Sequence, residues 1–71
     1  MNRDLTAKQE VIFKYIVDYL NANNQSPSQI EISKACNIGQ NNVGKYLEAI
    51  DRKGYIVYNK YFARSIELVV G

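Results

Sequence analysis

Three amide residues and one lysine near the middle of the chain have side chains that suit the edges of DNA bases. They are Gln40, Asn41, Asn42 and Lys45. In a major groove an amide pairs with adenine through two hydrogen bonds, and a lysine reaches a guanine edge or a phosphate. The competing interpretation is that the amides only cap a helix, because asparagine is favoured at helix starts. We favour base contact for Asn41, Asn42 and Lys45, whereas base contact and an N-cap role both remain open for Gln40.

A second group of residues, closer to the C-terminus, suits the DNA backbone. Lys60 and Arg64 flank two aromatic residues, Tyr61 and Phe62. Basic residues around exposed aromatic ones fit a loop that touches phosphates, and arginine also enters narrow minor grooves. The alternative is that the aromatic rings fold back over a small core, and for Phe62 we expect this.

Two more positions are candidates for phosphate contact. Ser28 stands at a predicted helix start, where backbone N–H groups can bind an anion. Tyr46 could place its hydroxyl on a phosphate at the edge of a groove, although an aromatic residue at its spacing is more often partly buried.

The elements that must position these residues follow from the spacing of apolar side chains. Ser28 and Glu31 form a capping-box pattern, which predicts a helix over about 29–36. Residues 37–39, Asn-Ile-Gly, then allow a left-handed turn. A second helix over about 41–53 is predicted by apolar residues three and four apart, namely Val43, Tyr46, Leu47 and Ile50. Two helices this short need a platform from the flanking segments.

The flanking segments predict that platform and a hairpin. A further capping box, Thr6 to Gln9, starts a helix over about 7–21, and residues 21–27 form a polar connecting loop. Gly54 ends the second motif helix, after which β-branched and aromatic residues alternate over 55–70 around a turn at 59–63. Ile56, Ile66 and Leu68 should lie on the core side. The expected fold is therefore mainly α with a small β-hairpin: one winged helix-turn-helix domain over 1–71, three helices followed by a two-stranded wing.

Composition narrows the class of protein. The chain has 71 residues, no histidine and one cysteine, Cys36, which we expect to be a small buried core residue. Without histidine, a metal-ligand cluster or a glycine-rich phosphate loop, the sequence predicts no enzyme, no cofactor and no metal. No segment is long and apolar enough to span a membrane or to act as a signal peptide, so we expect a cytoplasmic protein.

The charge of +2 is unevenly distributed. Residues 1–33 have three basic residues against four acids, and residues 34–71 have six against three. The positive charge therefore lies with the second motif helix and the wing, which suggests one basic face.

Taken together, several segments resemble the N-terminal DNA-binding domain of LexA-type repressors. In chain order they are Leu5-Thr6-Ala7-Lys8-Gln9 with Val11 and Phe13, Ser26-Pro27-Ser28 with Glu31-Ile32, Leu47-Glu48-Ala49-Ile50 with Arg52-Lys53-Gly54-Tyr55-Ile56, and Ala63-Arg64-Ser65-Ile66-Glu67-Leu68. The resemblance implies a winged helix that places its third helix in the major groove and its wing on the backbone or minor groove. It also implies a base contact for Asn41.

The sequence departs from that family at three points. Gly44 and Lys45 stand where the family often has acidic residues. The segment between Glu31 and Leu47 is also about one residue shorter, in the turn before the predicted recognition helix. The family's C-terminal self-cleaving protease domain has no counterpart before Gly71. We therefore expect either a small stand-alone regulator or an excised domain, with an operator of its own.

The function expected from these observations is sequence-specific binding of double-stranded DNA by a small transcriptional regulator in a bacterial cytoplasm or a phage-infected cell. We also expect this regulator to act as a homodimer or with an attached effector domain. Two alternatives are kept: a winged helix that serves as a protein–protein interaction module, and non-specific DNA binding in replication or segregation.

Overall fold

The first helix starts at the predicted capping box. In the computed structural model, which describes residues 4–62 and 64–69, α1 spans Ala7–Asn23. Thr6 accepts a hydrogen bond from the Gln9 backbone N–H, and the Gln9 side chain accepts one from the Thr6 backbone N–H. The helix runs two residues further than expected, because Asn24 takes the left-handed C-cap conformation at φ 57° and its N–H donates to the Leu20 carbonyl.

The helix pair follows the polar loop. Helix α2 spans Gln29–Cys36, and the capping box of Ser28 and Glu31 is present at its start. Asn37 ends α2 in the left-handed conformation at φ 56°, which confirms the predicted tight turn. That turn fixes the angle at which the next helix leaves.

Helix α3 spans Gln40–Arg52. Its N-cap is Gly39, which forms no side-chain cap hydrogen bond. The N-cap interpretation of Gln40 is therefore wrong, because this residue already lies in the first turn. Gly54 follows the helix at φ 90°, a conformation that favours glycine and turns the chain toward the sheet.

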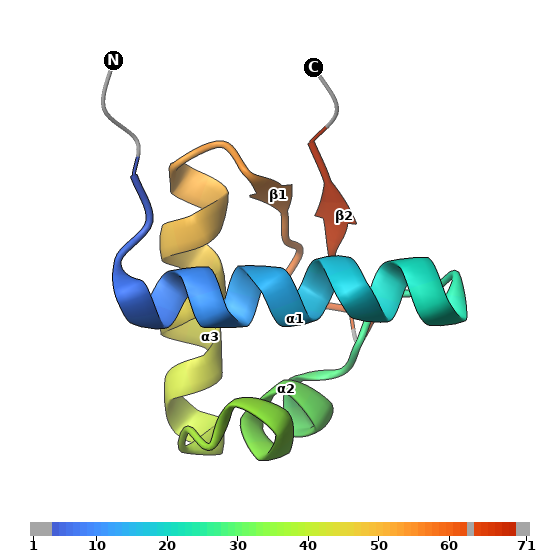
Figure 1. Cartoon of the computed structure of the whole chain (residues 1–71), viewed down its shortest axis with the longest axis horizontal. Coiled ribbons are helices and arrows are strands. Elements are labelled where there is room, and N and C mark those ends of the chain that lie inside the picture. The colour runs from blue at the N-terminus through green and yellow to red at the C-terminus, as the bar shows by residue number, and fades with distance from the viewer. Residues whose placement is uncertain (1–3, 63, 70–71) are drawn as a thin grey trace.

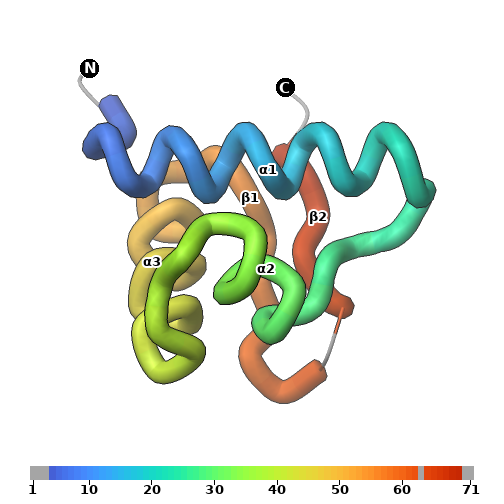
Figure 2. Tube along the Cα trace, turned by 60° about the horizontal axis from the view of Figure 1, so that its bottom comes forward, coloured from blue at the N-terminus to red at the C-terminus, as the bar shows by residue number. Residues whose placement is uncertain are grey.

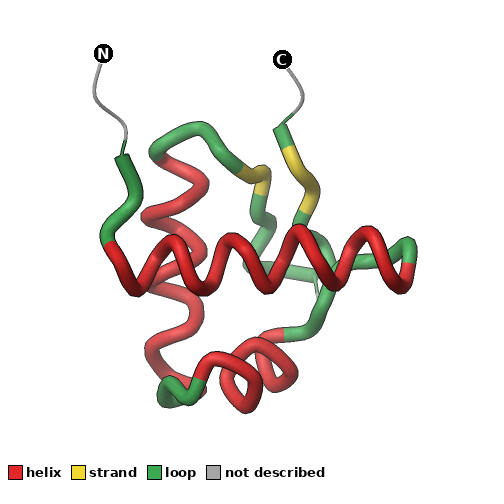
Figure 3. The backbone as a smooth tube through the Cα atoms, viewed as in Figure 1, coloured by secondary structure: helices red, strands yellow, loops and turns green. Residues whose placement is uncertain are grey.

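The wing is a two-stranded antiparallel sheet of β1, Ile56–Val57, and β2, Glu67–Leu68. Ile56 pairs with Leu68, and Val57 pairs with Glu67. The strands are shorter than the alternating pattern predicted, and a long loop joins them (Figure 3). Residues 63 and 70 of the predicted wing lie outside the described residues.

Side chains from all three helices and the wing form one core. Isoleucine dominates it, as α1 and α2 bury Ile12, Ile16, Ile32 and Cys36, α3 buries Val43, Leu47 and Ile50, and the wing segments bury Ile56 and Ile66. Leu68 packs against this cluster from a half-buried position. The burial expected for Cys36, Ile56 and Ile66 is confirmed.

Helix α1 is the platform on which the other elements pack. It lies across the molecule, with α2 below it and the strands above it, and α3 crosses behind it (Figure 1). Turning the molecule brings the wing loop into view beside the start of α2 (Figure 2). This arrangement confirms the winged helix-turn-helix expected from the sequence. Among the described residues, no helix combines the length and hydropathy needed to cross a bilayer.

Candidate nucleic-acid interface

The outward side of α3 presents a polar row along the helix axis. Asn41, Lys45, Glu48 and Arg52 are exposed and follow one another at helical spacing. Val43, Leu47 and Ile50 occupy the opposite, fully buried side. The fold thus fixes this helix through its apolar side and leaves the polar row open to a partner.

The amide side chains at the start of α3 are not used by the fold. Gln40, Asn41 and Asn42 are all exposed, and the helix has no side-chain cap hydrogen bond. Within the described part of the chain, no hydrogen bond engages these three side chains or that of Lys45. Their donors and acceptors are therefore available to an external ligand such as a base edge.

Tyr46 lies beside this group but is partly used by the core. Its ring is half-buried against the hydrophobic cluster. Together with Asn42, Lys45, Ala49 and Gln9 it lines a shallow hollow of about 380 Å³. A phosphate contact from its hydroxyl stays a prediction.

The wing tip is a compact turn organised by Asn59 and Ser65. The Asn59 side-chain oxygen accepts from the Tyr61 N–H at 3.0 Å, and the Asn59 backbone carbonyl accepts from the Phe62 N–H at 3.2 Å. The Ser65 hydroxyl donates to the same carbonyl at 2.6 Å. Lys60 is exposed, and its ammonium lies 5.7 Å from the centre of the Tyr61 ring.

The aromatic residues of the tip point away from the core. Tyr61 is 81% exposed and Phe62 is 68% exposed. The expectation that Phe62 would cover the core is wrong, because isoleucine side chains from four segments already fill that space. The tip therefore presents a cation and two rings on the outside of the molecule.

The wing tip and the start of α3 face a shared groove. A cavity of about 300 Å³ is lined by Gln40 from α3, by Ser28, Gln29 and Ile30 around the start of α2, and by Lys60, Tyr61 and Phe62 from the wing. Gln40 and Lys60, which belong to two different predicted contact groups, thus line the same groove.

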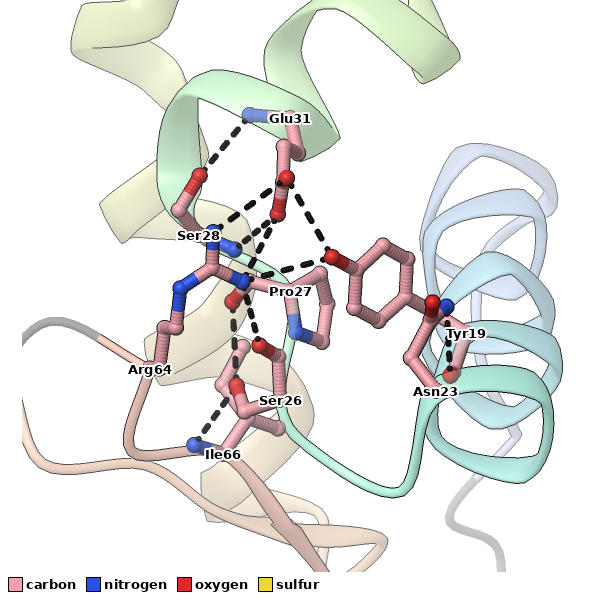
Figure 4. Close-up of polar contacts among 8 residues, drawn as sticks. All are labelled: Tyr19, Asn23, Ser26, Pro27, Ser28, Glu31, Arg64 and Ile66. Atoms are coloured by element: carbon pink, nitrogen blue, oxygen red, sulfur yellow. Dashed lines mark hydrogen bonds and ion pairs between the residues drawn. The ribbon is translucent and has the colours of Figure 1, made fainter.

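Two of the predicted contact residues are engaged inside the molecule. The backbone N–H of Ser28 donates to the Glu31 carboxylate at 2.9 Å, so it is not open to a phosphate. The guanidinium of Arg64 forms an ion pair with the same carboxylate at 3.0 Å (Figure 4). Any DNA contact by either group would have to compete with Glu31.

Comparison with known proteins decides the family. The family model described as LexA DNA binding domain matches residues 2–65. The chain belongs to the LexA DNA-binding domain family. It is 38% identical over 69 residues to the LexA repressor of Leptospira biflexa, a match that covers 97% of the chain and 34% of the relative. It is 33% identical over 67 residues to the LexA repressor of Thermosipho africanus, covering 94% of the chain and 34% of the relative.

A third LexA repressor, from Pseudothermotoga lettingae, is 30% identical over 69 residues, covering 97% of the chain and 34% of the relative. The chain thus spans about a third of the length of the curated relatives it matches. The recognised LexA resemblance and the fold that it implied are both confirmed.

Several residues that shape this LexA-family surface were not expected from the sequence. Gln29 on α2 donates to the hydroxyl of Tyr58 in the wing, and the Tyr58 N–H donates to Asp51 at the end of α3 at 3.0 Å. These contacts join residues that are 7 to 29 positions apart. No local pattern marks such partners, so only the fold could identify them.

Proposed function

We propose that this chain binds a specific sequence of double-stranded DNA as the DNA-binding part of a LexA-type transcriptional regulator. The observation that supports it best is the polar row of α3, whose amide and lysine side chains the fold leaves without partners. Membership of the LexA DNA-binding domain family supports the same function. In this proposal α3 enters the major groove and the wing lies along the backbone.

Each contact group has its own role in the proposal. Gln40, Asn41, Asn42 and Lys45 read base edges, because their donors and acceptors face outward from the first turns of α3. Lys60 and the hydroxyl of Tyr46 hold phosphates and set the position of the helix in the groove. Ser28 can join them only if a phosphate displaces the Glu31 carboxylate from its backbone N–H.

The tyrosines do not support a protein-interaction module. An exposed patch of Tyr46, Tyr55, Tyr58 and Tyr61 would have favoured one, but the first three are half-buried against the core. Tyr55 packs its ring edge-on against Phe13 at 5.2 Å between centroids. Only Tyr61 of these four side chains is largely exposed.

A second copy or a further domain should raise the specificity of this chain. One winged helix of this size contacts few base pairs, whereas two copies on neighbouring half-sites read about twice as many. The bacterial cytoplasm, or that of a phage-infected cell, is the location that fits a regulator of this kind. Analytical ultracentrifugation of the chain alone and with a selected DNA site tests the pairing.

The deciding experiment is a selection of binding sites from random duplex DNA at physiological salt. We expect a short enriched motif and a clear preference for it over scrambled DNA. Retention of all sequences with a steep salt dependence would indicate non-specific binding instead. Retention of no DNA at all would overturn the proposed function.

A further inference from the structure

Arg64 lies at the centre of a polar cluster that ties the wing to two helices (Figure 4). Its Nη1 atom donates to Glu31 Oε1 at 3.0 Å, and its Nη2 atom donates to Glu31 Oε2 at 3.3 Å. Nη1 also donates to the Ser26 carbonyl at 3.0 Å and lies 3.3 Å from the Tyr19 hydroxyl. One side chain from the wing thus contacts α1, α2 and the loop between them.

The carboxylate that receives Arg64 is itself held in place. Glu31 Oε1 accepts from the Ser28 N–H at 2.9 Å, and Glu31 Oε2 accepts from the Tyr19 hydroxyl at 3.2 Å. These contacts hold the Glu31 carboxylate in place independently of Arg64. A planar guanidinium facing a fixed carboxylate through two parallel bonds is a specific, oriented contact.

A buried serine extends the connection along the wing. Ser26 is 6% exposed, and its hydroxyl accepts from the Ile66 backbone N–H at 3.1 Å while donating to the Pro27 carbonyl at 2.9 Å. On the other side of the tip, Tyr58 accepts from Gln29. Both arms of the wing loop are therefore attached near the start of α2.

We propose that Arg64 is a positioning residue, which holds the wing tip at a fixed place relative to α3, and that it does not itself bind DNA phosphate. To reach a phosphate the guanidinium would have to leave Glu31, Ser26 and Tyr19 and would expose a bare carboxylate next to the DNA. Lys60 at the tip has no such competitor among the described residues. The proposal rests on the proposed DNA binding and refines it.

Glu31→Gln separates this role from simple electrostatics. Glutamine keeps the capping box, because its amide oxygen still accepts from Ser28. Removal of an acid should raise the affinity for DNA if only net charge counts, as in the matched control Glu10→Gln on the exposed side of α1. If the Arg64 contact positions the wing, Glu31→Gln should instead weaken binding to the selected site by up to about fivefold, the upper end for a surface ion pair.

The salt dependence of binding identifies the role of Arg64 itself. Arg64→Gln should weaken binding by the same factor as Glu31→Gln, and the double variant should bind no worse than either single variant. The slope of log K against log salt should stay at the wild-type value in all three. Lys60→Gln, the matched loss of a wing cation, should reduce that slope by about 0.9, the value for one phosphate contact.

Two results would overturn the proposal. One is that Glu31→Gln binds as tightly as Glu10→Gln, and the other is that Arg64→Gln reduces the salt slope by the value of one phosphate contact. If wild-type protein selects no site, the proposed function fails, and amide hydrogen exchange still tests the positioning role. The Ile66 amide should then exchange faster in both Glu31→Gln and Arg64→Gln, and unchanged exchange would count against it.

Discussion

Glu31 connects the ionisation of one residue to the stability of the whole wing attachment. Its backbone hydrogen bond from Ser28, and then its contact with Arg64, lower the pKa of the carboxyl from 4.5 to about 2. Because the folded pKa lies below the unfolded one, ionised Glu31 stabilises the fold fully above pH 4.5. This contribution is lost as the pH falls from there toward 2.

We therefore predict that acid removes the stability difference between wild type and Glu31→Gln. Chemical denaturation at a series of pH values should give a constant difference in the free energy of unfolding above about pH 5 and a shrinking one below it. In Arg64→Gln the loss should begin at the same pH but be smaller and end at a higher pH, because one cause of the lowered folded-state pKa is absent. A difference that does not change with pH would show that the carboxylate is not stabilised in this way.

Residues on α3 and on the wing should differ in how they affect specificity. Asn41→Ala and Lys45→Ala should reduce the preference for the selected site over a scrambled one, with about 1–3 kcal/mol lost for each base contact. Lys60→Ala should weaken binding to both DNAs alike. Fluorescence anisotropy titrations with both duplexes at two salt concentrations measure the two effects. Equal losses on both duplexes for Asn41→Ala would assign that residue to the backbone instead.

At the scale of elements, Gly44 is an unexpected residue inside α3. A Cβ atom at this position would meet the Tyr58 hydroxyl at 3.9 Å, which is ordinary van der Waals contact. Nothing in the described chain therefore demands glycine there.

We predict that Gly44→Ala stabilises the protein by about 0.5–1 kcal/mol, the usual cost of glycine within a helix. Thermal unfolding followed by circular dichroism would show a higher melting temperature. A lower melting temperature would mean that the wing packs against α3 more closely at this position than the distance to the Tyr58 hydroxyl indicates. The DNA affinity of the same variant reports whether the helix needs glycine against the backbone of a bound duplex.

Local signals account for how well the elements could be predicted. Capping boxes at Thr6 and Ser28 gave both helix starts, because each depends on residues only three apart. Helix α1 ends two residues later than the sequence predicts. Several asparagines in the loop could end a helix, and Asn24 is the one that takes the left-handed cap conformation. The strands are shorter than predicted because the hydroxyl of Ser65 and the side chain of Asn59 replace the ladder with a turn.

At the scale of the whole molecule, the contacts that could not be predicted are those between residues far apart in the sequence. Glu31 and Arg64 are 33 positions apart, and Ser26 and Ile66 are 40 apart. The sequence indicated a capping role for Glu31 and a DNA contact for Arg64, each reasonable in isolation. The predicted base-contact residues Asn41, Asn42 and Lys45, by contrast, lie within the predicted helix, and all three are exposed on α3.

The core that supports this surface contains the only cysteine of the chain. Cys36 is 7% exposed, and burial raises the pKa of its thiol. Thiol reagents should therefore leave the native protein almost unlabelled. A cysteine introduced at the wing tip by Tyr61→Cys would then be the single reactive handle, to which a DNA-cleaving chelate can be tethered. The positions of strand scission would map, nucleotide by nucleotide, where the wing lies on the operator.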